Sequence, residues 1–168
     1  MKTFLLGVFL GLCVIPVLVL LYFRLGMVPV ATAADPLPFE RRLAHMALAA
    51  KIAKDAPQQS PIPVNEANFA EGAKAYRTNC AVCHGLIGQP PTAIAKGMFP
   101  RPPQLFKGKG VTDDPAGETY WKAAYGIRLT GMPAFMGALT EDQLWQVSLL
   151  LANADKLPAS VKTSLSQP

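Results

Sequence analysis

The middle of the chain, from Gly85 to Val111, is too rich in proline and glycine to form a long helix or strand. It contains Gly-Gln-Pro-Pro and, further on, Phe-Pro-Arg-Pro-Pro-Gln-Leu-Phe-Lys-Gly-Lys-Gly. Proline and glycine interrupt regular structure, and long loops of this kind usually surround a functional site. The elements on either side of this loop must therefore supply the core.

A helical pattern precedes the loop, with small and apolar residues recurring on one face. The stripe consists of Phe69, Ala73, Tyr76, Cys80 and Cys83. Asn68 and Glu71 lie at the spacing of a capping box, so we expect the helix to begin at Asn68. The spacing places both cysteines on the buried side of its C-terminal end.

Two further helices are predicted after the loop. The first extends from Asp114 to Tyr125, followed by Gly126 as its C-terminal stop. The second opens at Thr140, with Gln143 in the capping-box position. Because no segment shows the alternating pattern of a strand, we predict an all-α domain of about three helices.

The predicted domain, residues 68–158, is followed by a tail at 159–168. Roughly ninety residues with so few helices bury little apolar surface of their own. We therefore expect an apolar group at the centre of the domain.

The motif Cys80-Ala-Val-Cys83-His84 has three interpretations. Structural zinc requires four Cys or His ligands, and only Cys13 and His45 remain elsewhere. A thioredoxin-like dithiol requires a preceding strand, which the pattern does not predict. Cys-x-x-Cys-His is also the pattern of covalent c-type haem attachment. Haem explains both the adjacent histidine and the missing core, so the motif favours one haem c, with its iron.

The iron of such a haem needs a sixth ligand, and Met132 in Thr-Gly-Met-Pro-Ala-Phe is the favoured candidate. Gly131 permits close approach of the backbone, and Pro133 stiffens the loop. The competing methionines are Met98, the next candidate, and Met27, Met46 and Met136.

The segment from about Asn68 to Leu157 resembles class I c-type cytochromes with one haem. The features that match are Gly-Ala-Lys-Ala-Tyr-Arg-Thr-Asn-Cys-Ala-Val-Cys-His-Gly, Pro-Arg-Pro-Pro-Gln-Leu, Tyr-Gly-Ile-Arg-Leu-Thr-Gly-Met-Pro-Ala-Phe and Leu-Thr-Glu-Asp-Gln-Leu-Trp-Gln-Val-Ser-Leu-Leu-Leu, in the order of the family. The resemblance implies a small cytochrome c fold of about three helices and long loops around one covalent haem. It also implies attachment at Cys80 and Cys83, with His84 as proximal and Met132 as distal ligand.

The resemblance implies further roles. A proline carbonyl should accept the hydrogen bond from the ligating histidine, and Pro90 is the matching position, with Pro91 possible. Gly72 and Trp145 match the small and aromatic residues at the crossing of the first and last helices. Haem propionates need polar partners, for which the candidates are Arg128, Arg101, Tyr120 and Trp121.

The N-terminal segment, residues 1–24, is predicted to be a membrane anchor. Residues 4–23 carry no charge, and twenty helical residues span about 30 Å, the thickness of the hydrocarbon core. A secretory signal ending near Ala-Thr-Ala, residues 31–33, is the alternative, but its apolar region is normally shorter. Residues 25–67 are predicted as a linker with a short basic amphipathic helix, whose apolar stripe is Phe39, Leu43, Met46 and Ala50. This helix could lie on the membrane, pack on the domain or act as a spacer.

The charge of +5 does not indicate a nucleic-acid partner, because residues 65–158 hold nine Lys or Arg against eight Asp or Glu. Four basic residues near the loop, which could steer an acidic redox partner or simply be solvated, are Lys96, Arg101, Lys107 and Lys109.

We expect an electron carrier rather than an enzyme. It would serve a membrane oxidoreductase or terminal oxidase, from a single-pass position in the bacterial inner membrane with the haem domain in the periplasm. The alternatives are a haem c subunit of a larger respiratory or dehydrogenase complex, and a haem enzyme or gas sensor.

Overall fold

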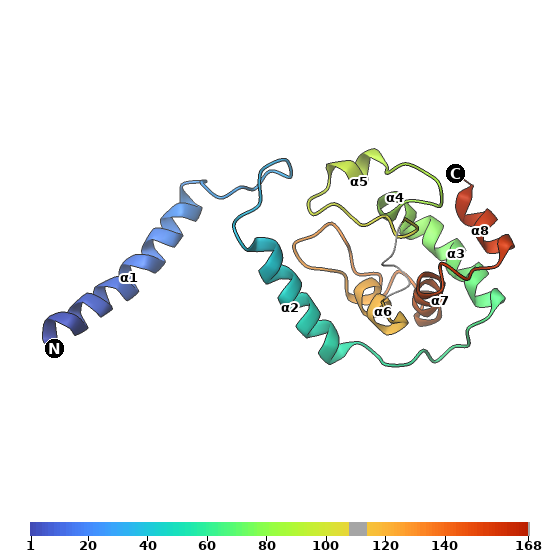
Figure 1. Ribbon diagram of the computed structural model, residues 1–168, viewed down its shortest axis with the longest axis horizontal. Helices are drawn as coiled ribbons and strands as arrows, with labels where there is room; N and C mark the ends of the chain where they lie inside the picture. Colours follow the sequence, from blue (N-terminus) through green and yellow to red (C-terminus); the bar gives the residue numbers. More distant parts are fainter. Residues whose placement is uncertain (108–113, 168) are drawn as a thin grey trace. The chain divides into compact units, whose positions relative to one another are not determined.

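The computed structural model describes residues 1–107 and 114–167, and within these ranges it is all-helical (Figure 1). The described residues form eight helices and no strand; an isolated bridge joins Met136 and Leu139. The prediction of an all-α fold is confirmed. The chain divides into two compact units, Met1–Leu43 and Ala44–Pro168.

The first unit contains α1 (Lys2–Arg24), which continues through Pro16. Of the described residues, only this helix is long and apolar enough to cross a membrane, and it lies near the N-terminus. A retained anchor and a signal sequence both have these properties.

The helix predicted in the linker is α2 (Glu40–Asp55). Its expected apolar stripe is exposed, with Met46 at 62%, whereas Ile52 is only 4% exposed. Further along, the Pro57 carbonyl lies so close to Gly117 that a Cβ there would overlap it. The second half of the linker is therefore part of the second unit and packs within it.

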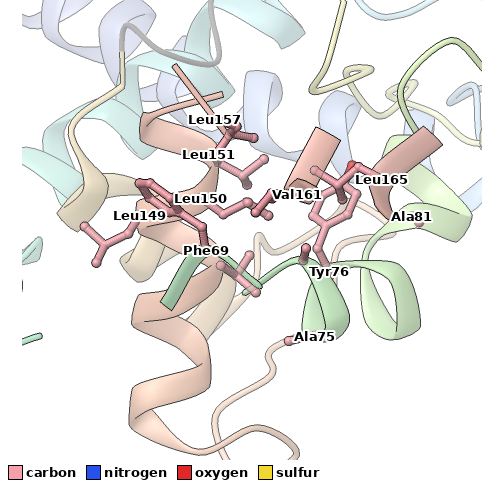
Figure 2. Packing of buried hydrophobic residues seen from close by; sticks show 12 residues of the cluster. Phe69, Ala75, Tyr76, Ala81, Leu149, Leu150, Leu151, Leu157, Val161 and Leu165 are labelled. Atoms are coloured by element: carbon pink, nitrogen blue, oxygen red, sulfur yellow. The ribbon is translucent and has the colours of Figure 1, made fainter. Parts of the chain in front are cut away.

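The core of the second unit is built on α3 (Glu66–Asn79) and α7 (Glu141–Ala152), which pack against each other. Helix α6 (Ala116–Tyr125) packs against α7, and α8 (Ala159–Ser166) against α3 (Figure 1). Figure 2 shows how α3, α7 and α8 contribute to one apolar cluster, with Tyr76 and Leu150 fully buried. Two further helices are short: α4 (Ala81–His84) directly follows α3, and α5 (Ala93–Gly97) lies within the long loop.

The helix ends follow local capping, although the predicted N-cap residues of α3 and α6 are wrong. The N-cap of α3 is Asn65, three residues before the expected Asn68, because the Asn65 side chain accepts a hydrogen bond from the Asn68 amide at 2.8 Å. The Asn68 side chain instead donates to the Pro63 carbonyl. At α7, the capping box between Thr140 and Gln143 is confirmed.

Helix α6 begins at Ala116 and ends at Tyr125, with Gly126 as its C-cap residue, as predicted. Gly126 has a φ of +67°, and a Cβ there would be 2.7 Å from the Ala134 nitrogen. Pro115 is the N-cap residue, so the helix starts slightly later than Asp114.

The segment expected as a tail contains α8. Val161 and Leu165, one helical turn apart, are buried in the same cluster as α3. The Ile87 amide donates to the Leu165 carbonyl at 3.0 Å, and the Arg77 guanidinium donates to the Ser164 carbonyl. These contacts join α8 to α3, which precedes the Cys-x-x-Cys-His motif, and to the segment that follows the motif.

The crossing of α3 and α7 is close enough that Gly72 meets the opposing backbone. A Cβ at Gly72 would lie 2.7 Å from the Gln146 carbonyl carbon and 3.2 Å from the Val147 nitrogen. Trp145, which the resemblance paired with Gly72, stacks on Tyr120 of α6, with ring centroids 4.3 Å apart. Gly72 thus serves the crossing, and the Trp145 ring joins α7 to α6.

Candidate haem site

A cavity of about 550 Å³ lies beside α4, enclosed by the long loop, α6 and the segment after α6. Its lining includes Cys80, Cys83, His84 and Met132. Residues more than fifty positions apart therefore meet around one space. The candidate attachment residues and the candidate ligands share a single cavity large enough for a sizeable apolar group.

Both cysteines of the motif are free thiols and half-buried. Burial, and to a smaller extent the neighbouring Cys83, raises the pKa of the Cys80 thiol to about 12. A redox dithiol instead needs a depressed pKa, so this environment does not suit one. Among the described residues, no group of three or more His, Cys, Asp or Glu could hold a metal ion, which leaves the zinc interpretation without ligands there.

His84 ends α4, and its Nδ1 lies 2.9 Å from the carbonyl oxygen of Pro103. The prediction of Pro90 as this partner is wrong, because the later part of the loop returns to the motif. The Leu105 amide donates to the His84 carbonyl at 3.2 Å, which holds this return in place. Pro90 is exposed.

The Pro103 carbonyl determines which nitrogen of His84 carries the proton. Because a carbonyl can only accept, Nδ1 must donate, and in the neutral ring Nε2 then keeps its lone pair. Burial lowers the pKa of His84, and the hydrogen bond with Pro103 opposes that effect. The ring is therefore neutral and oriented, with Nε2 available to a metal.

The loop that carries Met132 is held to the end of α6 by its own hydrogen bonds. The Thr130 hydroxyl donates to the Ile127 carbonyl at 2.7 Å and accepts from the Met132 amide at 3.1 Å. The Ile127 amide also donates to the Met132 carbonyl at 3.2 Å. These contacts limit the motion of the methionine that the sequence favours as a ligand.

Met98 also lines the cavity, so it stays a competitor of Met132. A Cβ at Gly131 would lie 3.5 Å from the Met98 sulfur and closer still to its methyl group. Glycine before Met132 therefore makes room for Met98. The other candidates, Met27, Met46 and Met136, are at least half exposed and do not line this cavity.

The cationic residues at the cavity differ in part from those expected. Arg101, Lys107 and Lys122 line it. Lys122 is held by Asp114 at 2.7 Å and by Glu118 at 3.7 Å. Arg128, the expected propionate partner, is exposed and does not line the cavity, and its role stays a prediction. The rings of Tyr120 and Trp121 pack on Trp145 and Tyr125 respectively, and Lys109 lies outside the described residues.

Several residues that sequence reasoning missed satisfy the carbonyls at the end of α4. The last carbonyls of any helix lack partners within the helix. The Val82 carbonyl accepts from Thr92 Oγ1 at 2.6 Å, and the Cys83 carbonyl accepts from Gln104 Nε2 at 3.1 Å. The His84 carbonyl accepts from the Leu105 amide at 3.2 Å, and the Gly85 carbonyl accepts from the Tyr76 hydroxyl at 2.8 Å. Four donors from three segments of the chain thus fix the turn that carries the motif. The sequence indicates that these carbonyls need hydrogen-bond donors, but it does not indicate which residues supply them.

These features fit covalently bound haem. Two thiols and a neutral, oriented imidazole lie in one turn, and two thioether sulfurs reach the same mostly apolar cavity. The thiols would form thioether bonds, and imidazole and thioether are established axial ligands of haem iron.

Comparison with known proteins gave a family match. Residues 67–149 match the family model described as cytochrome C oxidase, cbb3-type, subunit III. Among solved structures, a chain of the Kuenenia stuttgartiensis reducing HAO-like protein complex is 23% identical, with a TM-score of 0.48. The match covers 66% of this chain and 49% of that chain, so the present chain spans about half the length of that relative. No curated protein matches the sequence.

The family match and the geometry of the site agree. The match includes the Cys-x-x-Cys-His turn, the returning loop and Met132, which together surround the cavity. Residues 67–149 are therefore a class I c-type cytochrome domain, whose cofactor is covalent haem c and whose chemistry is electron transfer.

Proposed function

We propose that this chain is a membrane-tethered electron carrier with one haem. Cys80 and Cys83 attach the cofactor, and His84 and Met132 are its axial ligands. The observation that carries the proposal is the shared cavity, which all four residues line. When bound, the haem supplies one-electron chemistry through the Fe(II)/Fe(III) couple.

The protein's contribution is to hold the two proposed ligands still. The Pro103 carbonyl orients the His84 ring, and Thr130 restrains the backbone of Met132. If His84 and Met132 both ligated the iron, no open site for a substrate would remain. A thioether ligand raises the potential, which suits donation to an acceptor of positive potential.

Replacing Met132 by alanine tests the ligand assignment, and Met98→Ala is the matched control. We expect Met132→Ala to lower the reduction potential and to allow prompt binding of carbon monoxide to the reduced protein. Met98→Ala should leave both properties close to those of the parent. An unchanged optical spectrum in Met132→Ala, together with a changed one in Met98→Ala, would transfer the ligand role to Met98.

The proposed position is a single span of the bacterial inner membrane, with the haem domain in the periplasm. The length and apolar character of α1 support it, and Lys2 before the span gives weak support through the positive-inside rule. The full-length protein should stay with membranes after a high-salt wash. Recovery in the soluble fraction, with an N-terminus near Ala34, would mean that α1 is a cleaved signal.

A haem c subunit of a larger respiratory complex is the second candidate. The description of the matching family, an oxidase subunit, favours it. Native electrophoresis of mildly solubilised membranes distinguishes the two: a carrier migrates by itself, whereas a subunit migrates with a larger assembly. The redox partners we propose are a membrane oxidoreductase or a terminal oxidase.

A haem enzyme or gas sensor would need a vacant or labile iron position. Carbon monoxide added to the reduced parent protein separates these classes from a carrier. A carrier with a firm Met132 ligand binds it slowly or not at all, and prompt binding would favour the sensor or enzyme.

A further inference from the structure

Gln104 connects the returning loop to the haem-attachment turn. Its Nε2 donates to the Cys83 carbonyl at 3.1 Å. The two residues next to it both contact His84: the Pro103 carbonyl accepts from Nδ1 at 2.9 Å, and the Leu105 amide donates to the backbone carbonyl at 3.2 Å. Gln104 therefore sits between the two contacts that hold the histidine.

The other end of the same amide has no hydrogen-bond partner in the part of the chain that the structure describes. Gln104 Oε1 is buried without a hydrogen bond among the described residues. The amide occupies space that only a glycine leaves open, because a Cβ at Gly85 would lie 3.2 Å from Gln104 Cδ and nearer still to Oε1. Gly85 also has a φ of +76°, which favours glycine for a second reason.

This half-satisfied amide is a poor solution for packing alone. A buried oxygen without a donor carries a desolvation penalty, whereas an apolar side chain of similar shape carries none. The favourable contribution must come from the donor end, at Cys83. The hydrogen bond from Gln104 Nε2 to the Cys83 carbonyl must therefore account for the presence of the amide.

We propose that Gln104 is a positioning residue for His84. By holding the Cys83 carbonyl, it keeps the Pro103 carbonyl aligned with Nδ1 of the histidine. A hydrogen bond at Nδ1 makes the imidazole a more basic ligand, and a more basic ligand favours ferric over ferrous iron. The inference rests on the proposed function, in which His84 ligates the iron.

The variant Gln104→Met tests this role in the full-length holoprotein, because methionine has a similar length and no donor. We expect the His84 Nδ1 proton of the ferrous protein to exchange with solvent about fivefold faster, which corresponds to about 1 kcal/mol when tenfold is 1.4 kcal/mol. The ferric–ferrous equilibrium should shift about threefold toward ferrous iron. That is roughly half of the 59 mV that a tenfold change represents for one electron.

The stability of Gln104→Met should change little. The substitution leaves the Cys83 carbonyl without its donor, but it also removes the unpaired Oε1. The matched control is Gln89→Met, since Gln89 Nε2 donates to the Ser166 carbonyl at 3.3 Å, away from the attachment turn. The control should leave proton exchange and potential unchanged.

Two outcomes overturn the inference and can be told apart. If Gln104→Met lowers the melting temperature but leaves proton exchange and potential unchanged, Gln104 is structural only. If the parent protein itself lacks a haem-shifted His84 Nδ1–H resonance, His84 is not the ligand and the proposed function fails first. A shift in both readouts, absent in Gln89→Met, supports the positioning role.

Discussion

Replacing Gly72 by alanine would place a methyl group inside the crossing of α3 and α7. The Cβ would be 2.7 Å from the Gln146 carbonyl carbon and 3.2 Å from the Val147 nitrogen. Ordinary contacts of a Cβ begin near 3.4 Å. Because the opposing atoms are backbone, no side chain can rotate away, and one helix must shift.

Two effects of opposite sign set the magnitude. Alanine is favoured over glycine in a helix by about 1 kcal/mol, whereas overpacking a core costs roughly 1–3 kcal/mol. The upper part of that range applies here, since rigid backbone faces the methyl group. The net loss is about 2 kcal/mol, which lowers the melting temperature by roughly 8 °C in a unit of this size.

Thermal unfolding of the holoprotein, followed by far-ultraviolet circular dichroism, measures this loss. Gly97→Ala in α5 is the matched control, because a Cβ at Gly97 would meet no atom within 4 Å. Its melting temperature should stay within about 2 °C of the parent, as for other surface substitutions. If Gly72→Ala melts at or above the temperature of this control, the crossing is looser than the reasoning requires.

Three further predictions concern the surroundings of the haem. Tyr76→Phe removes the donor to the Gly85 carbonyl, which lies 2.8 Å from the Tyr76 hydroxyl. The substitution should lower the free energy of unfolding by about 1–2 kcal/mol and leave the visible spectrum unchanged. A melting temperature equal to the parent's would argue against that contact. Burial, assisted by Cys80, raises the pKa of Tyr76, so above about pH 10 the unfolded chain loses a proton that the folded protein keeps. The free energy of unfolding should therefore fall as the pH rises through this range, and it should fall less steeply in Tyr76→Phe. Equal slopes of stability against pH in the two proteins would contradict this. Thr130→Val removes both hydroxyl contacts of the Met132 loop. It should increase carbon monoxide binding to the reduced protein about fivefold, as expected for about 1 kcal/mol of lost restraint. Unchanged binding would show that the loop is held by other contacts.

Patterns that act over a few residues could be interpreted from the sequence. The stripe of Phe69, Ala73 and Tyr76 was predicted to be buried and is, and the Thr140 capping box opens α7 as expected. The Cys-x-x-Cys-His spacing identified the cofactor, because the chemistry of attachment depends on one turn of helix. Helical spacing and capping are local, so the sequence contains them directly.

Tertiary structure decided which distant residues serve the site. Pro103 rather than Pro90 meets His84, because the loop returns to the motif late and no local rule states where a proline-rich chain turns back. The contact of Gln104 with Cys83 and the docking of Leu165 in the core depend on the same long-range closure. The sequence by itself thus determined which chemistry the turn carries. Only the folded chain determined which carbonyls and donors hold that turn in place, because packing between segments selects those partners and spacing along the chain does not.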